Sequence, residues 1–193
     1  MAKIKICGMK RSEDIDFANK LNPDFIGFIL SDGFKRSIKP SIASELAVKL
    51  NSSIKVVGVF VNEPIENTEL DFIDIIQLHG NESPEYCSKI SKPLIKALTA
   101  ESFERIEEYE PYVDYFLFDS GCGTGKVFDW SLIPKTKKPF FLAGGLSAEN
   151  LAQAIDKIQP YSIDVSSSVE TDGKKDFNKM KDVINIVRSK NNG

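Results

Sequence analysis

The sequence predicts an α/β fold in which eight parallel strands and the helices between them close into one (β/α)8 barrel over residues 1–193. Short runs rich in β-branched and aromatic residues end at positions 7, 30, 60, 79, 98, 119, 144 and 166, about 23 residues apart. Each run is followed by a stretch with helical signals, so neighbouring strands pair in parallel through long connections. With 193 residues and 41% hydrophobic content, the chain can bury one sizeable core.

The first predicted strand, 3–7, alternates lysine with isoleucine and ends at Cys7. Because successive side chains of a strand point to opposite faces, we expect Ile4 and Ile6 to lie under the helices, and Lys5 and Cys7 to lie inside the barrel. The other strands are more apolar. They are predicted at 25–30, 55–60, 75–79, 94–98, 115–119, 140–144 and 161–166.

Helix-start signals lie between these strands. The residues in the capping position are Ser12, Ser41, Ser83 and Ser147. Pro84 follows Ser83 at the first helical position. Apolar residues then repeat at helical spacing, most clearly in 151–158 and 177–187.

Strand and helix in alternation close most simply into the TIM barrel. An open doubly wound sheet is the alternative. Its phosphate-binding fingerprint, Gly-x-Gly-x-x-Gly, is absent after the first strand, where residues 7–10 read Cys-Gly-Met-Lys. The barrel is therefore the favoured fold, and no linker divides it.

Composition excludes several classes of function. Lys and Arg number 25 against 28 Asp and Glu, so there is no basic field for nucleic acid. No apolar run approaches the roughly 18 residues of a membrane span, and residues 1–5 do not begin a secretory signal. Three cysteines without a Cys-x-x-Cys pair favour the reducing cytoplasm. With one histidine, a zinc site would need distant carboxylates, so we expect neither metal nor cofactor.

Polar residues and a glycine pair stand at the predicted strand ends, where barrels of this kind carry their chemistry. They are Cys7, His79, Asp119, Gly144, Gly145, Asp164, Ser166 and Ser167. Such groups at the ends of apolar strands are costly as packing but suit a polar cleft. The residues at these strand ends therefore indicate a functional site at the C-terminal end of the predicted barrel.

Cys7 and Asp119 are the candidate proton-transfer groups. Lys5, one pleat from Cys7, is expected to favour the thiolate and to lower the thiol pKa, which would make Cys7 a base. Asp119 follows an apolar strand, where a general acid could stand. The alternatives are a buried structural cysteine and a turn-capping carboxylate. Two such groups facing each other across the mouth, without a nucleotide or flavin motif, point to an isomerisation.

Substrate-binding groups are expected on three loops. Glycines 144 and 145 and serines 166 and 167 follow the seventh and eighth strands, where barrels commonly bind phosphate through backbone N–H groups. We therefore expect a phosphorylated sugar as the substrate. Arg36, after the second strand, could bind a substrate carboxylate in two-point fashion. Ordinary turns and a solvated arginine are the alternatives.

A glycine-rich segment, 121–126, reads Gly-Cys-Gly-Thr-Gly-Lys. It lacks the spacing of a nucleotide-binding loop, because Val127 stands where that motif has a hydroxyl. Alternate glycines keep a backbone permissive, so we interpret the segment as a mobile lid that follows Asp119.

Together these motifs closely resemble the phosphoribosylanthranilate isomerase family of tryptophan biosynthesis, over nearly the whole chain. The motifs are Lys5-Ile6-Cys7-Gly8, the stretch 27–36, Val57-Gly58-Val59-Phe60, Gln77-Leu78-His79-Gly80 with Glu82, Asp119 with 123–125 and 128–130, Ala143-Gly144-Gly145-Leu146 with Glu149-Asn150, and Asp164-Val165-Ser166-Ser167 with Val169-Glu170.

The resemblance implies an Amadori rearrangement of N-(5-phospho-β-D-ribosyl)anthranilate. It implies that Asp119 protonates the furanose ring oxygen and that Cys7 removes the C2 proton. It also implies that Arg36 holds the anthranilate carboxylate, that the seventh and eighth loops hold the phosphate, and that His79 and Asp164 line the sugar side.

Two positions depart from the family pattern. Ser168 replaces a usual glycine, which would strain the backbone if this position needs a positive φ. Cys122 and a short link replace part of the usual lid. Another barrel phosphosugar isomerase or epimerase, or a non-catalytic phosphosugar-binding barrel, are the remaining alternatives, and the sequence leaves the oligomeric state open.

Overall fold

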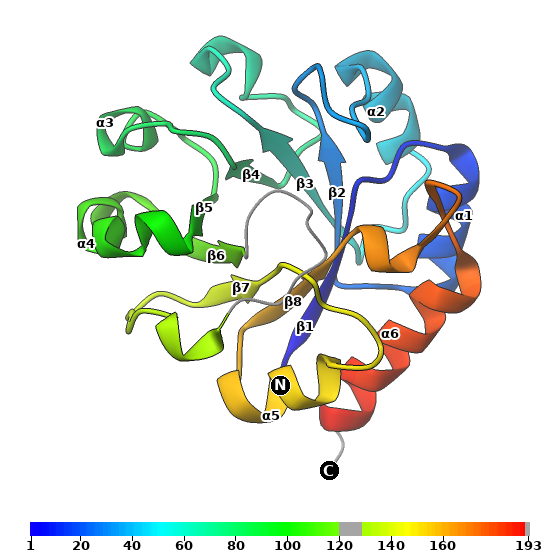
Figure 1. Cartoon of the computed structure of the whole chain (residues 1–193). Coiled ribbons are helices and arrows are strands. Elements are labelled where there is room, and N and C mark those ends of the chain that lie inside the picture. The colour runs from blue at the N-terminus through cyan, green and yellow to red at the C-terminus, as the bar shows by residue number, and fades with distance from the viewer. Residues whose placement is uncertain (120–128, 192–193) are drawn as a thin grey trace.

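The computed structural model of the chain describes residues 1–119 and 129–191, and these form a closed parallel barrel with the order β1 to β8 (Figure 1). The strands are β1 Lys3–Cys7, β2 Phe25–Ile29, β3 Lys55–Phe60, β4 Ile75–Leu78, β5 Leu94–Thr99, β6 Tyr115–Asp119, β7 Phe140–Leu142 and β8 Ser162–Val165. Parallel pairing of β1 with β8 closes the ring. The predicted barrel is confirmed.

Several strands end earlier than predicted. The segment 140–144 is a strand only to Leu142, because Gly144 and Gly145 have φ of 83° and 63°, which a strand cannot contain. His79 and Ser166 likewise lie just beyond β4 and β8. His79, Gly144, Gly145 and Ser166 are therefore loop residues just beyond their strands, whereas Cys7, Asp119 and Asp164 still belong to β1, β6 and β8.

The helices lie outside the barrel (Figure 1). They are α1 Ser12–Leu21, α2 Pro40–Ala47, α3 Pro84–Cys87, α4 Ile106–Tyr109, α5 Leu151–Ile158 and α6 Phe177–Asn191. Ser83 caps α3 as predicted, since its side chain accepts a hydrogen bond from the Tyr86 N–H. Helix α5 begins at Leu151, later than Ser147 predicts, and the N-caps of α1 and α2 are Arg11 and Lys39.

A helix does not follow every strand. Between β3 and β4 the chain forms only a 3₁₀ turn, η1 Ile65–Asn67, so the prediction of strand and helix throughout is wrong there. The β5–β6 connection is built from η2 Ala100–Arg105, α4 and η3 Glu110–Tyr112. The described part of the β6–β7 connection contains η4 Trp130–Leu132. Short connections of this kind let eight strands close within 193 residues.

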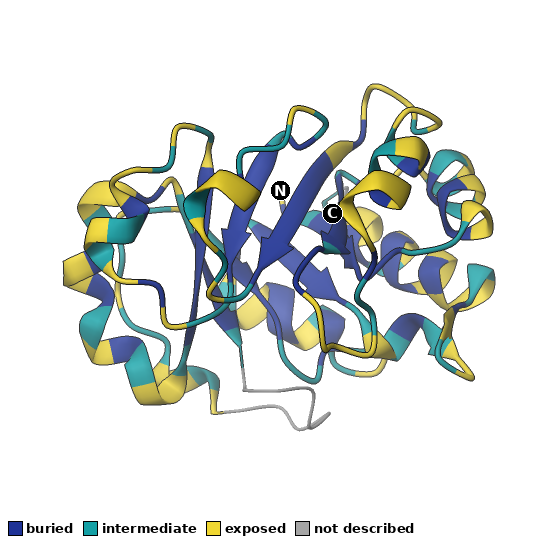
Figure 2. Cartoon of the chain, turned by 90° about the horizontal axis from the view of Figure 1, so that it is seen from above, coloured by how far each residue is buried: buried dark blue, intermediate teal, exposed yellow. Residues whose placement is uncertain are grey.

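The core has two layers, and the strands between them are buried (Figure 2). Ile4 and Ile6 pack outward with the helices, whereas Cys7 belongs to the inner cluster, so the predicted alternation of β1 is confirmed. At the N-terminal ends of the strands, aromatic rings fill the interior. The ring centroids of Phe25 and Phe141 are 5.3 Å apart, and those of Tyr115 and Tyr161 are 5.2 Å apart. The candidate site residues, Cys7, His79, Asp119 and Asp164, lie at the opposite, C-terminal ends of the strands.

Candidate active site

Cys7 ends β1 inside the barrel and is 7% exposed. The neighbouring strand makes room for it with Gly27, since a Cβ at that position would lie 2.8 Å from the Cys7 Sγ. Burial raises the pKa of the Cys7 thiol above its usual value, and the nearby charge of Lys5 only partly opposes this effect. The predicted lowering of the Cys7 pKa is therefore wrong in this structure.

The reason lies in the partner of Lys5. Its Nζ is 3.0 Å and 3.1 Å from the two carboxylate oxygens of Asp164, and the side chain is fully buried. Burial works against the charge of Lys5, but Asp164 and Cys7 together raise its pKa. The pKa of Asp164 is raised by burial, against the effect of Lys5. Lys5 is thus an ammonium shared between Asp164 and the thiol.

His79 and Asp119 meet at the ends of β4 and β6. The Nε2 of His79 is 3.3 Å from the Oδ2 of Asp119, and the Nδ1 of His79 is 3.0 Å from the Nε2 of Gln77. Asp164 acts electrostatically on His79, on Asp119 and on Cys7. Four predicted site residues therefore lie close together, although they come from strands that are far apart in the sequence.

Arg36 is held by a carboxylate that the sequence did not single out. Its Nε donates to Oε1 of Glu170 at 2.6 Å, and its Nη2 donates to Oε2 at 3.0 Å. Lys175 donates to the same Oε1 at 2.9 Å and to the Ser166 carbonyl oxygen. Burial alone would raise the pKa of Glu170, but Arg36 and Lys175 outweigh it and lower the value to about 2. Gly8, with φ of 80°, gives Arg36 its space, because a Cβ there would lie 2.4 Å from the Arg36 Cδ.

These additional residues lie on a short hairpin after β8. Glu170 belongs to β9 Glu170–Thr171, and Lys175 belongs to β10 Lys174–Lys175. Glu170 appears in a family motif, so the resemblance could have assigned it a role. Lys175 stands in a polar, charged stretch with no pattern that predicts burial, yet it is 4% exposed. Burial lowers its pKa, although Glu170 opposes this.

The two segments predicted to bind phosphate follow β7 and β8 as loops. Gly144 and Gly145 follow β7 in left-handed conformations, and the Nδ2 of Asn150 donates to the Gly145 carbonyl oxygen at 2.9 Å. Ser166 donates from its hydroxyl to the Cys7 carbonyl oxygen at 3.0 Å, which ties the end of β8 to β1. Ser167 begins the turn η5 Ser167–Val169 and is exposed.

Ser168 lies in the same turn. It is absent from the described residues with positive φ, so the condition under which a serine here would strain the backbone is not met. Its Oγ is buried and has no hydrogen-bond partner within the described part of the chain. The predicted lid, 121–126, and the link to it lie outside the described residues.

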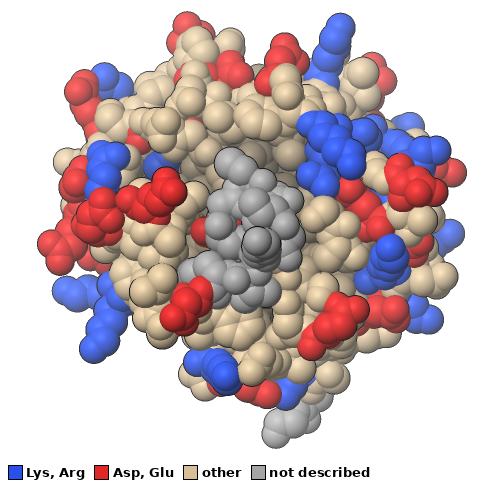
Figure 3. All heavy atoms as spheres, in the orientation of Figure 1, with Lys and Arg blue, Asp and Glu red and all other residues tan. Residues whose placement is uncertain are grey.

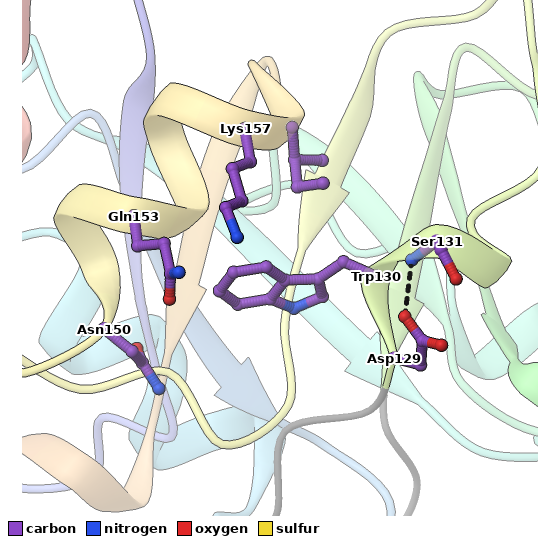
Figure 4. A pocket seen from close by; sticks show the side chains of 7 residues that line it. Asp129, Trp130, Ser131, Asn150, Gln153 and Lys157 are labelled. Carbon is purple, nitrogen blue, oxygen red and sulfur yellow. Dashed lines mark hydrogen bonds between the residues drawn. The ribbon is translucent and has the colours of Figure 1, made fainter.

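A cavity of about 570 Å³ lies beside the barrel, between η4 and α5 (Figure 4). Its lining residues include Trp130, Gln153 and Lys157, and the Trp130 ring points toward the side chains of α5. None of the predicted site residues lines it. The titratable groups, the left-handed glycines and the buried ion pairs all favour the barrel mouth instead.

On the face shown in Figure 3, Lys, Arg, Asp and Glu side chains are interspersed around the rim. No helix in residues 1–119 and 129–191 combines the length and apolar character needed to cross a membrane. In the same residues, no group of three His, Cys, Asp or Glu side chains is placed to hold a metal ion.

Comparison with known proteins identifies relatives of this chain and of its fold. Residues 4–186 match the family model described as N-(5'phosphoribosyl)anthranilate (PRA) isomerase. The N-(5'-phosphoribosyl)anthranilate isomerase of Endomicrobium trichonymphae is 43% identical over 202 residues, covering 98% of this chain and 100% of that protein. The enzyme of the same name from Caldanaerobacter subterraneus subsp. tengcongensis is 44% identical, covering 97% of this chain and 98% of the relative.

Solved structures agree. The phosphoribosyl anthranilate isomerase of Thermotoga maritima superposes with a TM-score of 0.89 at 37% identity, covering 98% of this chain and 100% of the other. A further structure is described as phosphoribosyl anthranilate isomerase in complex with reduced 1-(o-carboxyphenylamino)-1-deoxyribulose 5-phosphate. It has a TM-score of 0.85 at 35% identity, with the same coverage of both chains.

Proposed function

The chain belongs to the N-(5′-phosphoribosyl)anthranilate isomerase family, and from this premise we propose how the residues of its barrel mouth carry out the reaction. The protein is an isomerase of tryptophan biosynthesis that acts on a phosphorylated small molecule. It converts N-(5-phospho-β-D-ribosyl)anthranilate to 1-(2-carboxyphenylamino)-1-deoxy-D-ribulose 5-phosphate. The alternatives of another phosphosugar isomerase and of a non-catalytic barrel are therefore not retained.

In the first step Asp119 acts as the general acid. Its carboxyl proton passes to the furanose ring oxygen while the bond between this oxygen and C1 breaks. The nitrogen lone pair forms the C1–N double bond, so the open chain is a protonated Schiff base and Asp119 becomes a carboxylate. The Nε2 of His79, 3.3 Å from Oδ2, supports this role because it can hydrogen-bond the new charge.

In the second step Cys7 acts as the general base. Its thiolate takes the C2 proton, and the electron pair of the C–H bond forms the enolamine while the nitrogen charge is neutralised. The enolamine then tautomerises to the ketone, and solvent returns a proton from Cys7 to Asp119. Lys5 supports the base, because its ammonium favours the thiolate that burial opposes.

The substrate is bound at its two charged ends. Glu170 accepts hydrogen bonds from the Nε and Nη2 of Arg36. We assign the remaining N–H donors of the guanidinium to the anthranilate carboxylate. The backbone after β7, at Gly144 and Gly145, and the serines after β8, Ser166 and Ser167, are assigned to the phosphate. His79 and Asp164 are left to line the sugar between these ends.

The observation that carries this assignment is the gathering of Cys7, His79, Asp119 and Asp164 at one end of the barrel. Aromatic rings fill the other end. A turnover assay tests it, in buffer with a chelator and no added cofactor. We expect purified protein to remove the anthranilate-type fluorescence of the substrate. Unchanged fluorescence at micromolar enzyme would contradict the assignment.

We propose one domain over residues 1–193, since Asn191 and Ala2 exchange hydrogen bonds of 2.8 Å between the two ends of the described chain. We also propose a cytoplasmic location, supported by the free thiols of Cys7 and Cys87 and by the biosynthetic role of the family.

A further inference from the structure

We propose that Gln77 is a positioning residue, whose amide sets which nitrogen of His79 carries the proton and so makes His79 a hydrogen-bond donor to Asp119. The inference deepens the proposed function and rests on the role of Asp119 as the acid. It concerns a residue whose amide hydrogen-bonds His79.

Gln77 lies in the inner wall of the barrel. Strand β4 turns Ile75 and Gln77 inward, and His79 follows on the same face one residue after the strand ends. The register places Val59 of β3 and Ile95 of β5 beside Gln77, and both are buried in the apolar inner cluster. The side chain of Gln77 is itself 1% exposed, so its amide is surrounded largely by hydrocarbon.

The direction of the hydrogen bonds follows from the atoms that meet. The Gln77 Nε2 is 3.0 Å from the Nδ1 of His79, and an amide nitrogen can only donate. Nδ1 must therefore accept, and in a neutral imidazole the proton then sits on Nε2. Nε2 faces the Oδ2 of Asp119 at 3.3 Å. The chain of donors runs from Gln77 through His79 to the carboxylate.

Stability does not explain this glutamine. Its Oε1 is buried and has no hydrogen-bond partner within the described residues, and leaving a polar atom in that state costs free energy. An apolar side chain of similar length would fill the same wall without this cost. A residue that weakens the core but orients a group at the mouth fits a functional role.

The position of the proton on His79 affects how readily Asp119 acts as the acid. When Asp119 gives up its proton it becomes a carboxylate beside Asp164, and the two like charges repel each other. The Nε2–H of His79 offsets this repulsion at Oδ2. With the proton on Nδ1, the bare Nε2 lone pair would instead face the carboxylate, and the departing proton would leave a less stable anion.

His79 is the only histidine of the chain, so NMR of protein labelled with ¹⁵N-histidine reports on this imidazole alone. Spectra are recorded without substrate at about pH 8.5, where an ordinary histidine, with a pKa of about 6.5, is neutral. We expect the proton on Nε2 in the wild type and a larger share of the Nδ1–H tautomer in Gln77→Met, where only Asp119 still favours the Nε2–H form. The Nδ1–H form in the wild type, or an unchanged tautomer in Gln77→Met, would overturn the proposal.

Kinetics complete the test. Gln77→Met should lower kcat about tenfold or more, as expected when a hydrogen bond to a charged group is lost, while thermal stability is kept or raised. Gln153→Met makes the same replacement on the exposed side of α5 and should change neither tautomer nor kcat. Wild-type kcat in Gln77→Met would also overturn the proposal. A wild-type kcat in Asp119→Asn would contradict the role of Asp119 as the acid. That outcome is distinct from a failure of the Gln77 proposal, because the tautomer of His79 is measured without substrate and without turnover.

Discussion

The guanidinium of Arg36 and the carboxylate of Glu170 form a two-point ion pair, although the two residues are 134 positions apart in the sequence. Lys175 also donates to this carboxylate, at the Oε1 that accepts from the Arg36 Nε. A free arginine side chain samples many rotamers, whereas this one is fixed before substrate arrives. Fixing a binding group in advance reduces the entropy that is lost on binding. Glu170 therefore links the hairpin after β8 to the proposed recognition of the substrate carboxylate.

Arg36→Lys should mainly weaken substrate binding. A lysine keeps the charge but cannot bind Glu170 and a second carboxylate through separate edges of one planar group. We expect KM to rise about tenfold or more with a smaller change in kcat. Steady-state kinetics measure this split. A lowered kcat at unchanged KM would contradict the assignment of Arg36 to ground-state binding.

Glu170→Gln should destabilise the protein in a way that depends on pH. In the folded chain the pKa of Glu170 is lowered to about 2 from the usual 4.5. A carboxyl group with a depressed pKa stabilises the fold above its unfolded-state pKa, and this contribution is lost as the pH falls through the folded value. The variant should therefore have a lower free energy of unfolding at neutral pH. Its deficit relative to wild type should shrink between about pH 4.5 and about pH 2.

Urea unfolding at about pH 7 and about pH 2.5 measures that deficit. The exposed Glu45 on α2 gives the matched control, Glu45→Gln, for which we expect little change at either pH. A deficit for Glu170→Gln that stays constant across this range would show that the ion pairs with Arg36 and Lys175 do not carry the effect.

Gly27→Ala should displace the catalytic sulfur. A Cβ at this position would lie 2.8 Å from the Cys7 Sγ, so the thiol must move away. We expect kcat to fall about tenfold or more, because general base catalysis depends on the position of the base. Gly58→Ala on β3 is the control. Its Cβ would be crowded by Ile73 on the outer side of the barrel, so it should lower stability but leave kcat near wild type.

Alkylation should show that Cys7 is a weakly ionised thiol in the free enzyme. Burial raises the pKa of Cys7, and only the thiolate reacts with iodoacetamide. In a Cys122→Ser background, the modification rate of Cys7 should therefore still rise at pH values above about 8.5, the ordinary thiol pKa. Mass spectrometry of the Cys7 peptide follows it. A rate that levels off near neutral pH would indicate a thiolate and would contradict the effect of burial.

The barrel could be predicted from the sequence because its strands are short, apolar and regularly spaced. His79 and Asp119 could be singled out because each follows an apolar run at a strand end, and Cys7 because it ends a strand that places Lys5 on the same face. Where helices were expected, the short link after β3 forms a single 3₁₀ turn instead. The positions of the strand ends depended on glycine conformations that residue type alone does not fix.

The partners within the site could not be predicted. Lys5 interacts with Asp164 as well as with Cys7. Only the three-dimensional arrangement shows that burial raises the pKa of the Cys7 thiol more than the Lys5 ammonium lowers it. Gln77 reads in sequence as one polar residue within an apolar strand. Its relation to His79 depends on the two side chains leaning toward each other along the same face of β4. Such pairings are set by register and rotamer, which a single sequence does not encode locally.

The most direct test of the whole account is the kcat of Cys7→Ser and Asp119→Asn, followed by the loss of substrate fluorescence. We expect each variant to fold and to lose about 10²-fold or more in kcat, the usual size of a general acid or base contribution. Cys87→Ser, which changes a buried cysteine on the outer side of the barrel, should retain wild-type turnover. Wild-type kcat in either Cys7→Ser or Asp119→Asn would contradict the claim that these two residues transfer the protons of the rearrangement.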